Sequence, residues 1–316
     1  MSNIKKVVYY FCIDSELDPV ASRIFNEVKA LKELIETDIT VDENKILKWC
    51  DEAGNEFYFV RTYKPVCHDY NYYLPVMNRY FSDFDMAGLV TWHEGQNAPD
   101  KVLTVHSTGD VNSANFGSAN PFYMRNLLLA MEKYKTEEGL EDFRVVTEAT
   151  HWSGIVYDEG NPGLILDYKV PIVDIEIGSS EESWSNKTAA RVISKSLFSV
   201  FDSDNKKIYS ILCAGGTHFE PAFINAVLMV ANEKAFAVSH ILPNQWLVSG
   251  EYENPSGTKK LEACVSSITG GISGIVFHDG LKGIYKEQIR TLARKYNIPA
   301  FKHQLLRRPE DIQWNE

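Results

Sequence analysis

An apolar strand that leads through a short polar loop into an amphipathic helix is the pattern that most constrains the fold of this chain. It first occurs near the start, where a buried strand predicted over Ile4–Ile13 is followed by Asp18-Pro19, an N-cap with proline at the first helical position. The apolar residues from Ile24 to Ile35 then fall on one face at helical spacing. Strands that alternate with helices pack in layers, so the opening of the chain predicts an α/β protein.

The same pattern is clearest in the middle of the chain. A strand is predicted over Ile172–Ile177, followed by a polar loop and a long helix, for which Ser179 and Glu182 have the spacing of a capping box. A second strand, Ile208–Cys213, runs into Gly215-Gly216-Thr217-His218 and another helix. Open α/β sheets bind ligands beyond the carboxyl ends of their strands, so both loops are candidate binding sites.

The remaining elements divide the chain into a large and a small part. Further strands are predicted over Glu56–Thr62, Met86–Trp92, Val102–His106 and Phe143–Thr150, with a helix over Pro121–Tyr134. After about residue 232 the pattern changes to a loop, a helix (258–268), a strand (274–278), a helix (281–296) and a strand (300–303). We therefore predict an α/β core domain with the active site over residues 1–232 and a small α/β subdomain packed on it over residues 233–316.

Composition narrows the class of protein. The 316 residues are 44% hydrophobic and 24% charged, which allows a sizeable buried core. Nowhere do 18 apolar residues run together, and the apolar run at the N-terminus is too short to span a membrane, so no membrane partner is predicted. The five cysteines are odd in number and form no CxxC pair, which favours reduced thiols and a cytoplasmic location over a disulfide framework.

The net charge of −11 bears on nucleic-acid partners. Phosphate contacts dominate non-specific nucleic-acid binding, so an acidic chain is not expected to bind DNA, and it handles tRNA only through a local basic patch. Basic residues gather near the C-terminus, namely Lys282, Lys286, Arg290, Arg294, Lys295, Lys302, Arg307 and Arg308. They form either a solvated helix face or a surface for the tRNA backbone.

Five of the eight histidines lie in or beside a loop that follows a predicted core strand: His93, His106, His151, His218 and His240. Each taken alone is explained by a structural hydrogen bond, whereas the set favours a shared site. Imidazole exchanges protons near neutral pH and is a common metal ligand. The sequence has no HExxH helix and no G-x-S-x-G elbow, so activated water is a simpler nucleophile than a side chain.

A carboxylate and two glycine-containing loops complete the candidate site. Glu176 lies near the end of an apolar strand and is either a general base or metal ligand, or a salt-bridged structural acid. Gly178 and Ser179, at a predicted helix start, either present backbone N–H groups to an anion or form a plain helix cap. Gly215 and Gly216 allow a close approach of the backbone to a ligand.

The segment from Cys67 to Tyr80 is crowded with tyrosines. These rings either stack on a terminal adenine base of a ligand or pack within the protein. The group comprises Tyr63, Tyr70, Tyr72, Tyr73 and Tyr80.

Several of these segments together resemble one family. They are Leu103-Thr104-Val105-His106-Ser107-Thr108-Gly109, Glu148-Ala149-Thr150-His151, Asp174-Ile175-Glu176-Ile177-Gly178-Ser179-Ser180-Glu181-Glu182-Ser183-Trp184, Gly215-Gly216-Thr217-His218-Phe219-Glu220-Pro221 and His240-Ile241-Leu242-Pro243. In this order they look like the archaeal-type D-aminoacyl-tRNA deacylases. The resemblance runs from residue 4 to about 243 and is weaker beyond.

The resemblance implies a three-layer α/β/α, phosphorylase/hydrolase-like fold with a mixed sheet and an extra α/β piece. It also implies hydrolysis of the ester of D-aminoacyl-tRNA, with Zn²⁺ as cofactor. The sequence leaves a monomer and a homodimer both open as the working form. From the residues and the resemblance together, we predict His151, His218 and Glu176 as catalytic. The predicted anion- or substrate-binding residues are Gly178, Ser179, Gly215, Gly216 and Thr217, and the predicted metal ligands are His106, His151, His218 and His240.

Two positions depart from the family pattern. Trp152 stands where the family has a second adjacent histidine, and Thr217 stands where it has a third glycine. These departures keep two alternatives open. One is another hydrolase on the same fold, such as a zinc-dependent amidase or carboxypeptidase-like enzyme. The other is a non-catalytic relative that binds tRNA or nucleotides.

Overall fold

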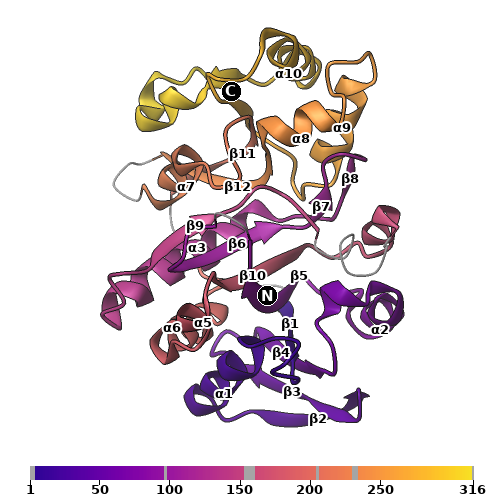
Figure 1. The fold of residues 1–316 in the computed structure, drawn as a ribbon, viewed down its shortest axis with the longest axis vertical. Coiled ribbons are helices and arrows are strands. Elements are labelled where there is room, and N and C mark those ends of the chain that lie inside the picture. The colour runs from indigo at the N-terminus through magenta and orange to yellow at the C-terminus, as the bar shows by residue number, and fades with distance from the viewer. Residues whose placement is uncertain (1–3, 96–97, 153–160, 204–205, 230–233, 315–316) are drawn as a thin grey trace.

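The computed structural model describes residues 4–95, 98–152, 161–203, 206–229 and 234–314. Within these ranges the chain forms a large sheet and a smaller one, which occupy the lower and upper parts of the molecule in Figure 1. A short two-stranded ribbon, β7 (Gly109–Asp110) with β8 (Asn115–Phe116), lies beside them.

The large sheet has eight strands and is mixed. In sheet order they are β2 (Ile35–Val41), β3 (Asn44–Cys50), β4 (Glu56–Thr62), β1 (Lys6–Cys12), β5 (Met86–His93), β10 (Ile172–Gly178), β6 (Val102–Ser107) and β9 (Arg144–Thr147). The central strands β4, β1, β5 and β10 are parallel, whereas β6 and β9 run antiparallel to β10. The predicted mixed sheet is therefore confirmed.

Alternation along β1 shows why helices cover both faces of this sheet. Val7, Tyr9 and Phe11 point into one apolar cluster, whereas Val8 and Tyr10 point into another. Successive side chains of a strand face opposite sides, so a strand that is apolar throughout requires cover on both. The continuous apolar run seen in the sequence is thus the signature of a central strand.

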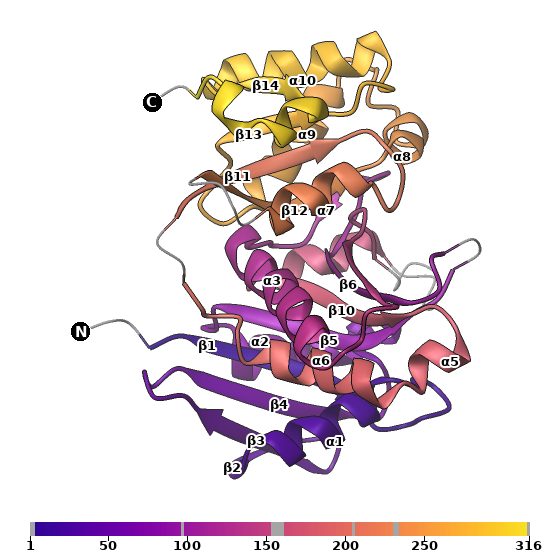
Figure 2. The same ribbon diagram turned by 90° about the vertical axis from the view of Figure 1, so that its left-hand side faces the viewer.

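Helices cover both faces. One face carries α1 (Ala21–Leu31), α3 (Pro121–Glu137) and α6 (Lys187–Leu197), which Figure 2 shows in front of the sheet. The other carries α2 (Tyr70–Phe81) and the 3₁₀ helix η2 (Pro162–Asp167), which pack on the second cluster. This is the predicted three-layer α/β/α arrangement. Among the described residues, the helices are all too short or too polar to cross a membrane.

The strand pairing in the smaller sheet does not match the predicted domain boundary. Its strands, all parallel, are β12 (Lys234–Leu242), β11 (Lys207–Ala214), β13 (Gly274–Phe277) and β14 (Ala300–Lys302). The helices around it are α7 (Pro221–Leu228), α8 (Asn244–Ser249), α9 (Gly257–Ser266) and α10 (Gly283–Tyr296). A boundary at 232/233 would separate β11 from its partner β12. The second unit therefore begins at β11, because strand pairing joins segments that sequence pattern alone keeps apart.

Two helix starts also differ from the sequence prediction. Helix α1 begins at Ala21, although the carboxylate of Asp18 still accepts hydrogen bonds from the N–H groups of Val20 and Ala21. The long helix predicted after residue 182 is broken into α5 (Glu181–Trp184) and α6, because the Asn186 side chain caps a new helix.

The tyrosine-rich segment packs within the protein. Tyr70 and Tyr73 are buried in the cluster under α2, and the hydroxyl groups of Tyr72 and Tyr73 donate to Asp42 at 2.9 and 2.6 Å. These contacts favour the packing interpretation over stacking on a tRNA base.

Candidate active site

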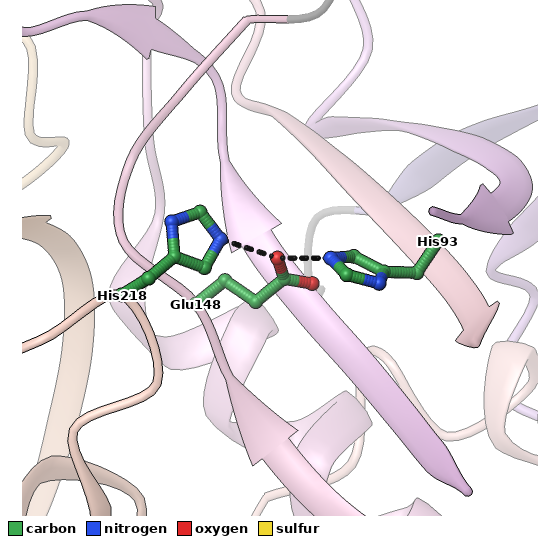
Figure 3. A group of neighbouring side chains, drawn as sticks. All are labelled: His93, Glu148 and His218. Carbon is green, nitrogen blue, oxygen red and sulfur yellow. Dashed lines mark hydrogen bonds and ion pairs between the residues drawn. The ribbon is translucent and has the colours of Figure 1, made fainter. Parts of the chain in front are cut away.

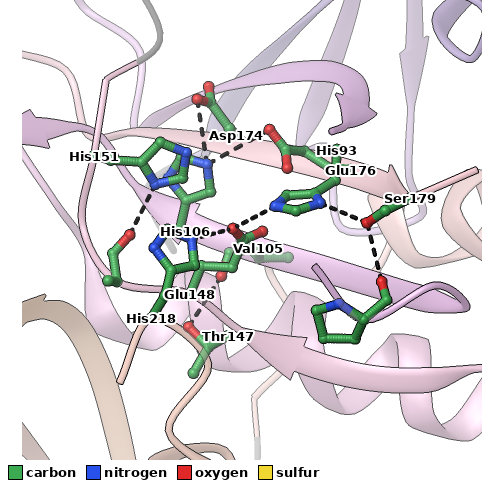
Figure 4. A network of polar contacts seen from close by, with 12 residues as sticks. His93, Val105, His106, Thr147, Glu148, His151, Asp174, Glu176, Ser179 and His218 are labelled. Carbon is green, nitrogen blue, oxygen red and sulfur yellow. Dashed lines mark hydrogen bonds and ion pairs between the residues drawn. The ribbon is translucent and has the colours of Figure 1, made fainter. Parts of the chain in front are cut away.

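The candidate site gathers side chains from four strands of the large sheet and one loop of the smaller sheet. His93 ends β5, Glu148 follows β9, Glu176 lies near the end of β10, and His106 lies in β6 opposite Asp174. These strands lie side by side. Figure 4 shows that the side chains of His151 and His218 lie among those of the strand residues.

Glu148 lies at the centre of this cluster. Its side chain is fully buried, and its Oε2 lies 2.8 Å from His218 Nε2 and 3.1 Å from His93 Nε2 (Figure 3). Burial alone would raise the pKa of Glu148, but the hydrogen bonds from His218 and His93 outweigh it and hold that pKa well below its usual range. Glu148 is therefore an ionised carboxylate held between two imidazoles.

The hydroxyl of Ser179 orients the ring of His93 through its Nδ1–H group. Ser179 Oγ donates to the Pro99 carbonyl at 3.0 Å, so its contact of 2.7 Å with His93 Nδ1 requires that Nδ1–H donates. His93 Nε2 is then left to face Glu148. Burial lowers the pKa of His93, but the contacts with Glu148 more than offset it, and the pKa is raised above its ordinary value.

His106 and His151 are oriented in the same way by backbone carbonyls. His106 Nδ1 lies 3.2 Å from the Ser107 carbonyl, and His151 Nδ1 lies 2.9 Å from the Ala149 carbonyl. Since a carbonyl only accepts, each Nδ1 is a donor, and the Nε2 of each ring is the nitrogen free to face the cluster. The two rings stack with centroids 3.9 Å apart. Burial, together with the neighbouring His106, lowers the pKa of His151 well below its ordinary value, so that ring is neutral.

Two further carboxyl groups lie beside His106. Its Nε2 is 3.5 Å from Asp174 Oδ2 and 3.5 Å from Glu176 Oε1. Burial raises the pKa of Asp174 to about 7, and it raises the pKa of Glu176 well above the ordinary value, with the charge of Glu148 adding to the effect. Burial therefore favours the protonated form of Glu176, whereas the two histidines favour the ionised form of Glu148.

The donor set fits a metal such as Zn²⁺. Three groups have ligand atoms within 4.8 Å of one another: His93 with Glu148 and His218, His106 with Glu148 and His151, and His106 with Asp174 and Glu176. Among the described residues, four buried atoms of the cluster have no hydrogen-bond partner, namely His106 Nε2, Glu148 Oε1, Asp174 Oδ1 and Glu176 Oε2. Imidazole nitrogens fixed through their other nitrogen, together with carboxylate oxygens, are the ligands that zinc prefers.

A small cavity of about 70 Å³ opens onto the cluster. His93, His151 and Glu176 form its polar wall, and Thr91 and Trp92 of β5 lie beside them. The same cavity is lined by Cys67, His68 and Glu94. His93, His151 and Glu176 are thus accessible to a small ligand.

Of the predicted residues, the structure brings together His106, His151, His218 and Glu176, and it leaves His240 out. The His240 ring is buried, with Nδ1 at 2.9 Å from Ser107 Oγ and Nε2 at 2.9 Å from Ser267 Oγ. Both nitrogens have hydroxyl partners, so the ring is a structural histidine and the prediction that it binds metal does not fit its placement.

The predicted anion-binding loops have other roles. The N–H of Gly215 donates to the Leu242 carbonyl at 2.7 Å, and that of Thr217 faces Glu220 Oε2 at 3.4 Å, so neither amide is directed at a ligand. Gly215 has φ +89°, a conformation that suits glycine, and the Gly215-Gly216 turn carries the chain to His218. The loop therefore positions His218.

Gly178 and Ser179 serve His93. A Cβ added at Gly178 would lie 2.6 Å from His93 Cβ, so only glycine lets the two strands bring His93 into place. The helix cap predicted for Ser179 belongs to Ser180, whose hydroxyl accepts from the N–H of Ser183. For Gly178 and Ser179 the structure therefore favours the positioning of His93 over the predicted binding of an anion.

Three members of the cluster, His93, Glu148 and Asp174, are not among the residues predicted as catalytic or metal-binding. Glu148 and Asp174 lie within the family motifs, and His93 belongs to the set of strand-end histidines that favours a shared site. The position of Glu148, one residue beyond a core strand and three before His151, was the available signal.

The two departures from the family pattern lie away from the cluster's reactive atoms. The Trp152 ring is buried against Tyr70, with centroids 5.1 Å apart, and it packs in the core under α2. Ser153 and Gly154, which follow it, lie outside the described residues. Thr217 is exposed.

Comparisons with known proteins identify the family of the chain. The model of the D-aminoacyl-tRNA deacylase family matches residues 80–301, a range that contains the whole cluster. A D-aminoacyl-tRNA deacylase of Methanospirillum hungatei is 25% identical over 222 residues, covering 69% of this chain and 45% of the relative. One of Pyrococcus furiosus is 30% identical over 210 residues, covering 63% of this chain and 67% of the relative. The chain thus spans less than half of the Methanospirillum protein and two thirds of the Pyrococcus protein.

The fold has a solved counterpart. A crystal structure of a conserved protein of unknown function superimposes with a TM-score of 0.74 at 17% identity and covers 98% of both chains. This likeness supports the fold over its full length. The family match and the relatives carry the assignment: the chain belongs to the D-aminoacyl-tRNA deacylase family.

Proposed function

We propose that this protein hydrolyses the ester that joins a D-amino acid to tRNA, releasing the free D-amino acid and the tRNA. Membership of the family supports this substrate. The observation that carries the chemistry is the buried carboxylate of Glu148 held between His93 and His218, beside a cavity that a small ligand can enter. Hydrolysis of an ester by water needs a proton acceptor, a proton donor and a means of stabilising charge on the carbonyl oxygen.

We propose His93, Glu148 and His218 as the residues that hold Zn²⁺. When bound, this ion supplies a Lewis acid for the carbonyl oxygen and lowers the pKa of water. The protein's own contribution is to fix the ligands. The Ser179 hydroxyl and the Pro99 carbonyl hold the ring of His93, and burial keeps Glu148 free of competing solvent.

His151 and Glu176 are suited to move the protons. The lone pair on His151 Nε2 accepts a proton from the attacking water, while Nδ1–H stays on the Ala149 carbonyl. The new C–O bond forms at the ester carbonyl and the bond to the ribose oxygen breaks. Glu176 lies in the wall of the same cavity and its burial favours the protonated form, which suits it to donate a proton to that leaving oxygen.

We place the reaction in the cytoplasm, where charged tRNA is found, with tRNA as partner and no role for DNA or a membrane. The proposal holds for a monomer or a homodimer, since every residue it uses comes from one chain.

The test compares D-tyrosyl-tRNA with L-tyrosyl-tRNA and follows the release of tyrosine by the purified protein, with zinc and with a chelator. We expect selective loss of the D-ester and loss of turnover with the chelator. Glu148→Gln keeps the shape of the side chain and removes its charge, so turnover should fall by at least roughly 100-fold.

Two results would contradict the proposal. Hydrolysis of N-acyl amino acids without any release from charged tRNA would select the amidase alternative. Stoichiometric binding of charged tRNA without turnover, with or without zinc, would select the non-catalytic binder.

A further inference from the structure

A second and larger cavity, of about 730 Å³, adjoins the candidate active site. Its volume lies within the range of roughly 300–1,000 Å³ that is typical of small-molecule sites. It shares Trp92 and Glu94 with the small cavity onto which His93, His151 and Glu176 open. The two cavities therefore lie next to each other, on either side of Trp92 and Glu94 or around them. The full lining is Ser15, Glu16, Leu17, Pro19, Arg23, Trp92, Glu94, Glu181, Glu182, Trp184 and Ser185.

Two indole rings line this cavity, and both are tied to His93. Trp92 precedes His93 in β5, and its Nε1 lies 3.5 Å from Glu94 Oε2. Trp184, in α5, donates from Nε1 to the His93 carbonyl at 3.1 Å. Both side chains are half-buried, so each ring is held by the protein and keeps some accessible surface. Aromatic faces of this kind are stacking platforms for nucleic-acid bases.

The negative charge of the residues that line this cavity favours binding of a nucleic-acid base over binding of the phosphate backbone. Four carboxylates face the cavity, those of Glu16, Glu94, Glu181 and Glu182, against one guanidinium, that of Arg23. Lys101 pairs with Glu182 at 2.9 Å and offsets one of these charges. The carboxylates would repel a run of phosphates. An uncharged base with an exocyclic amino group can instead stack on the indole rings and donate hydrogen bonds to the carboxylates.

We propose that this cavity binds the terminal adenosine of the aminoacyl-tRNA, with its base against Trp92 and Trp184 and its amino group directed at the carboxylates. The inference rests on the proposed function and deepens it. The ribose, which carries the ester, then lies at the junction of the two cavities beside Trp92 and Glu94. The aminoacyl group enters the small cavity toward His151 and Glu176. The rest of the bound tRNA extends out of the open side of the cavity, so its phosphates remain in solvent.

The arrangement links nucleoside binding to the reacting groups. A base held on Trp184 steadies an indole that donates directly to the carbonyl of His93. The nucleoside thus helps to align His93 with Glu148, in addition to placing the ester.

The test measures binding of adenosine and of cytidine to the full chain by calorimetry, and the KM and kcat for D-tyrosyl-tRNA. We expect adenosine to bind at least tenfold more tightly than cytidine, and AMP to bind no more tightly than adenosine. Trp184→Leu should weaken adenosine binding and raise KM by at least tenfold, with a smaller change in kcat. Trp184→Phe, which keeps a stacking face, should restore most of the affinity.

Phe122→Leu is the matched control, because Phe122 is exposed at the start of α3 and does not line either cavity. It should change neither adenosine binding nor KM. If Trp184→Leu does not fold, Glu94→Gln replaces it: the loss of one carboxylate acceptor should weaken adenosine binding several-fold while the fold is kept.

The outcomes separate this inference from the proposed function. Release of D-tyrosine without measurable adenosine binding, or with adenosine affinity unchanged in Trp184→Leu, overturns the adenosine site and leaves the deacylase proposal intact. Adenosine binding that is lost in Trp184→Leu, in a protein that releases no D-tyrosine, supports the cavity assignment and contradicts the deacylase proposal.

Discussion

At the scale of single residues, the two serines that follow Gly178 have different roles. The Ser179 hydroxyl accepts from His93 Nδ1–H, whereas the Ser180 hydroxyl caps α5. We expect Ser179→Ala to reduce turnover or metal affinity by about 10–100-fold, the usual effect of removing a group that orients a ligand. The readouts are kcat and zinc content, with a thermal melt as the control.

The neighbouring variant Ser180→Ala is the matched control for Ser179→Ala. It should lower the free energy of unfolding by about 1 kcal/mol through loss of the cap and leave kcat unchanged. Equal losses of activity in the two variants would contradict the positioning role of Ser179.

The histidines divide into two groups that mutation should distinguish. His218 is partly exposed and contacts Glu148, whereas His240 is fully buried among the hydroxyls of Ser107, Thr150 and Ser267. We expect His218→Ala to cut turnover by more than roughly tenfold with little change in the melt. His240→Ala should instead destabilise the fold by about 1–3 kcal/mol, because it leaves buried hydroxyls without a partner. A stable His240→Ala protein that has lost its zinc would contradict this division.

At the scale of elements, the start of α1 makes stability depend on pH. Burial raises the pKa of Asp18 from 3.8 to about 6, although hydrogen bonds from the N–H groups of Ala21 and Val20 partly offset it. The folded state therefore binds this proton more tightly than the unfolded state. Its contribution to stability is greatest below about pH 4 and is lost as the pH rises to about 6, a change of roughly 3 kcal/mol.

Asp18→Asn tests this dependence. The amide keeps an oxygen acceptor for the two backbone N–H groups and carries no charge to bury, so the variant should be more stable than the native protein at pH 8 by about 1–3 kcal/mol. The advantage should vanish near pH 4. Urea unfolding at both pH values measures it, and an equal difference at the two would show that Asp18 does not titrate in this range.

The bounds of the helices and strands show which features a local sequence pattern predicts and which it misses. The sequence placed β4 at its observed bounds and the start of α3 at Pro121, because hydrophobic period and proline position are local signals. It merged α5 and α6, because the helical period of their apolar residues does not reveal that Asn186 begins a new cap.

At the scale of the whole molecule, the two sheets share one core. Ile211 and Val238 of the smaller sheet belong to the same apolar cluster as Val105 and Ile175 of the large sheet. We therefore expect one cooperative unfolding transition in calorimetry and no separate transition for the C-terminal part. Two resolved transitions would show that the sheets unfold independently.

A fragment made of residues 1–232 tests the corrected boundary. It retains β11 and removes β12, which pairs with it over the whole strand. An apolar strand edge and part of the shared core would then be exposed, so the fragment should aggregate or remain unfolded. A monomeric, folded fragment, judged by size-exclusion chromatography and circular dichroism, would restore the boundary first predicted from the sequence.

The sequence by itself determined the alternation of strands and helices, the loops at the strand ends and the family motifs. These follow from local periodicity, turn residues and short strings, which need no knowledge of distant contacts. The tertiary structure alone decided that Glu148 lies between His93 and His218, that Ser179 orients His93, and that β11 belongs with β12. The physical reason is that these contacts join residues tens of positions apart, through strand order and the geometry of single hydrogen bonds, and neither leaves a periodic signal in the chain.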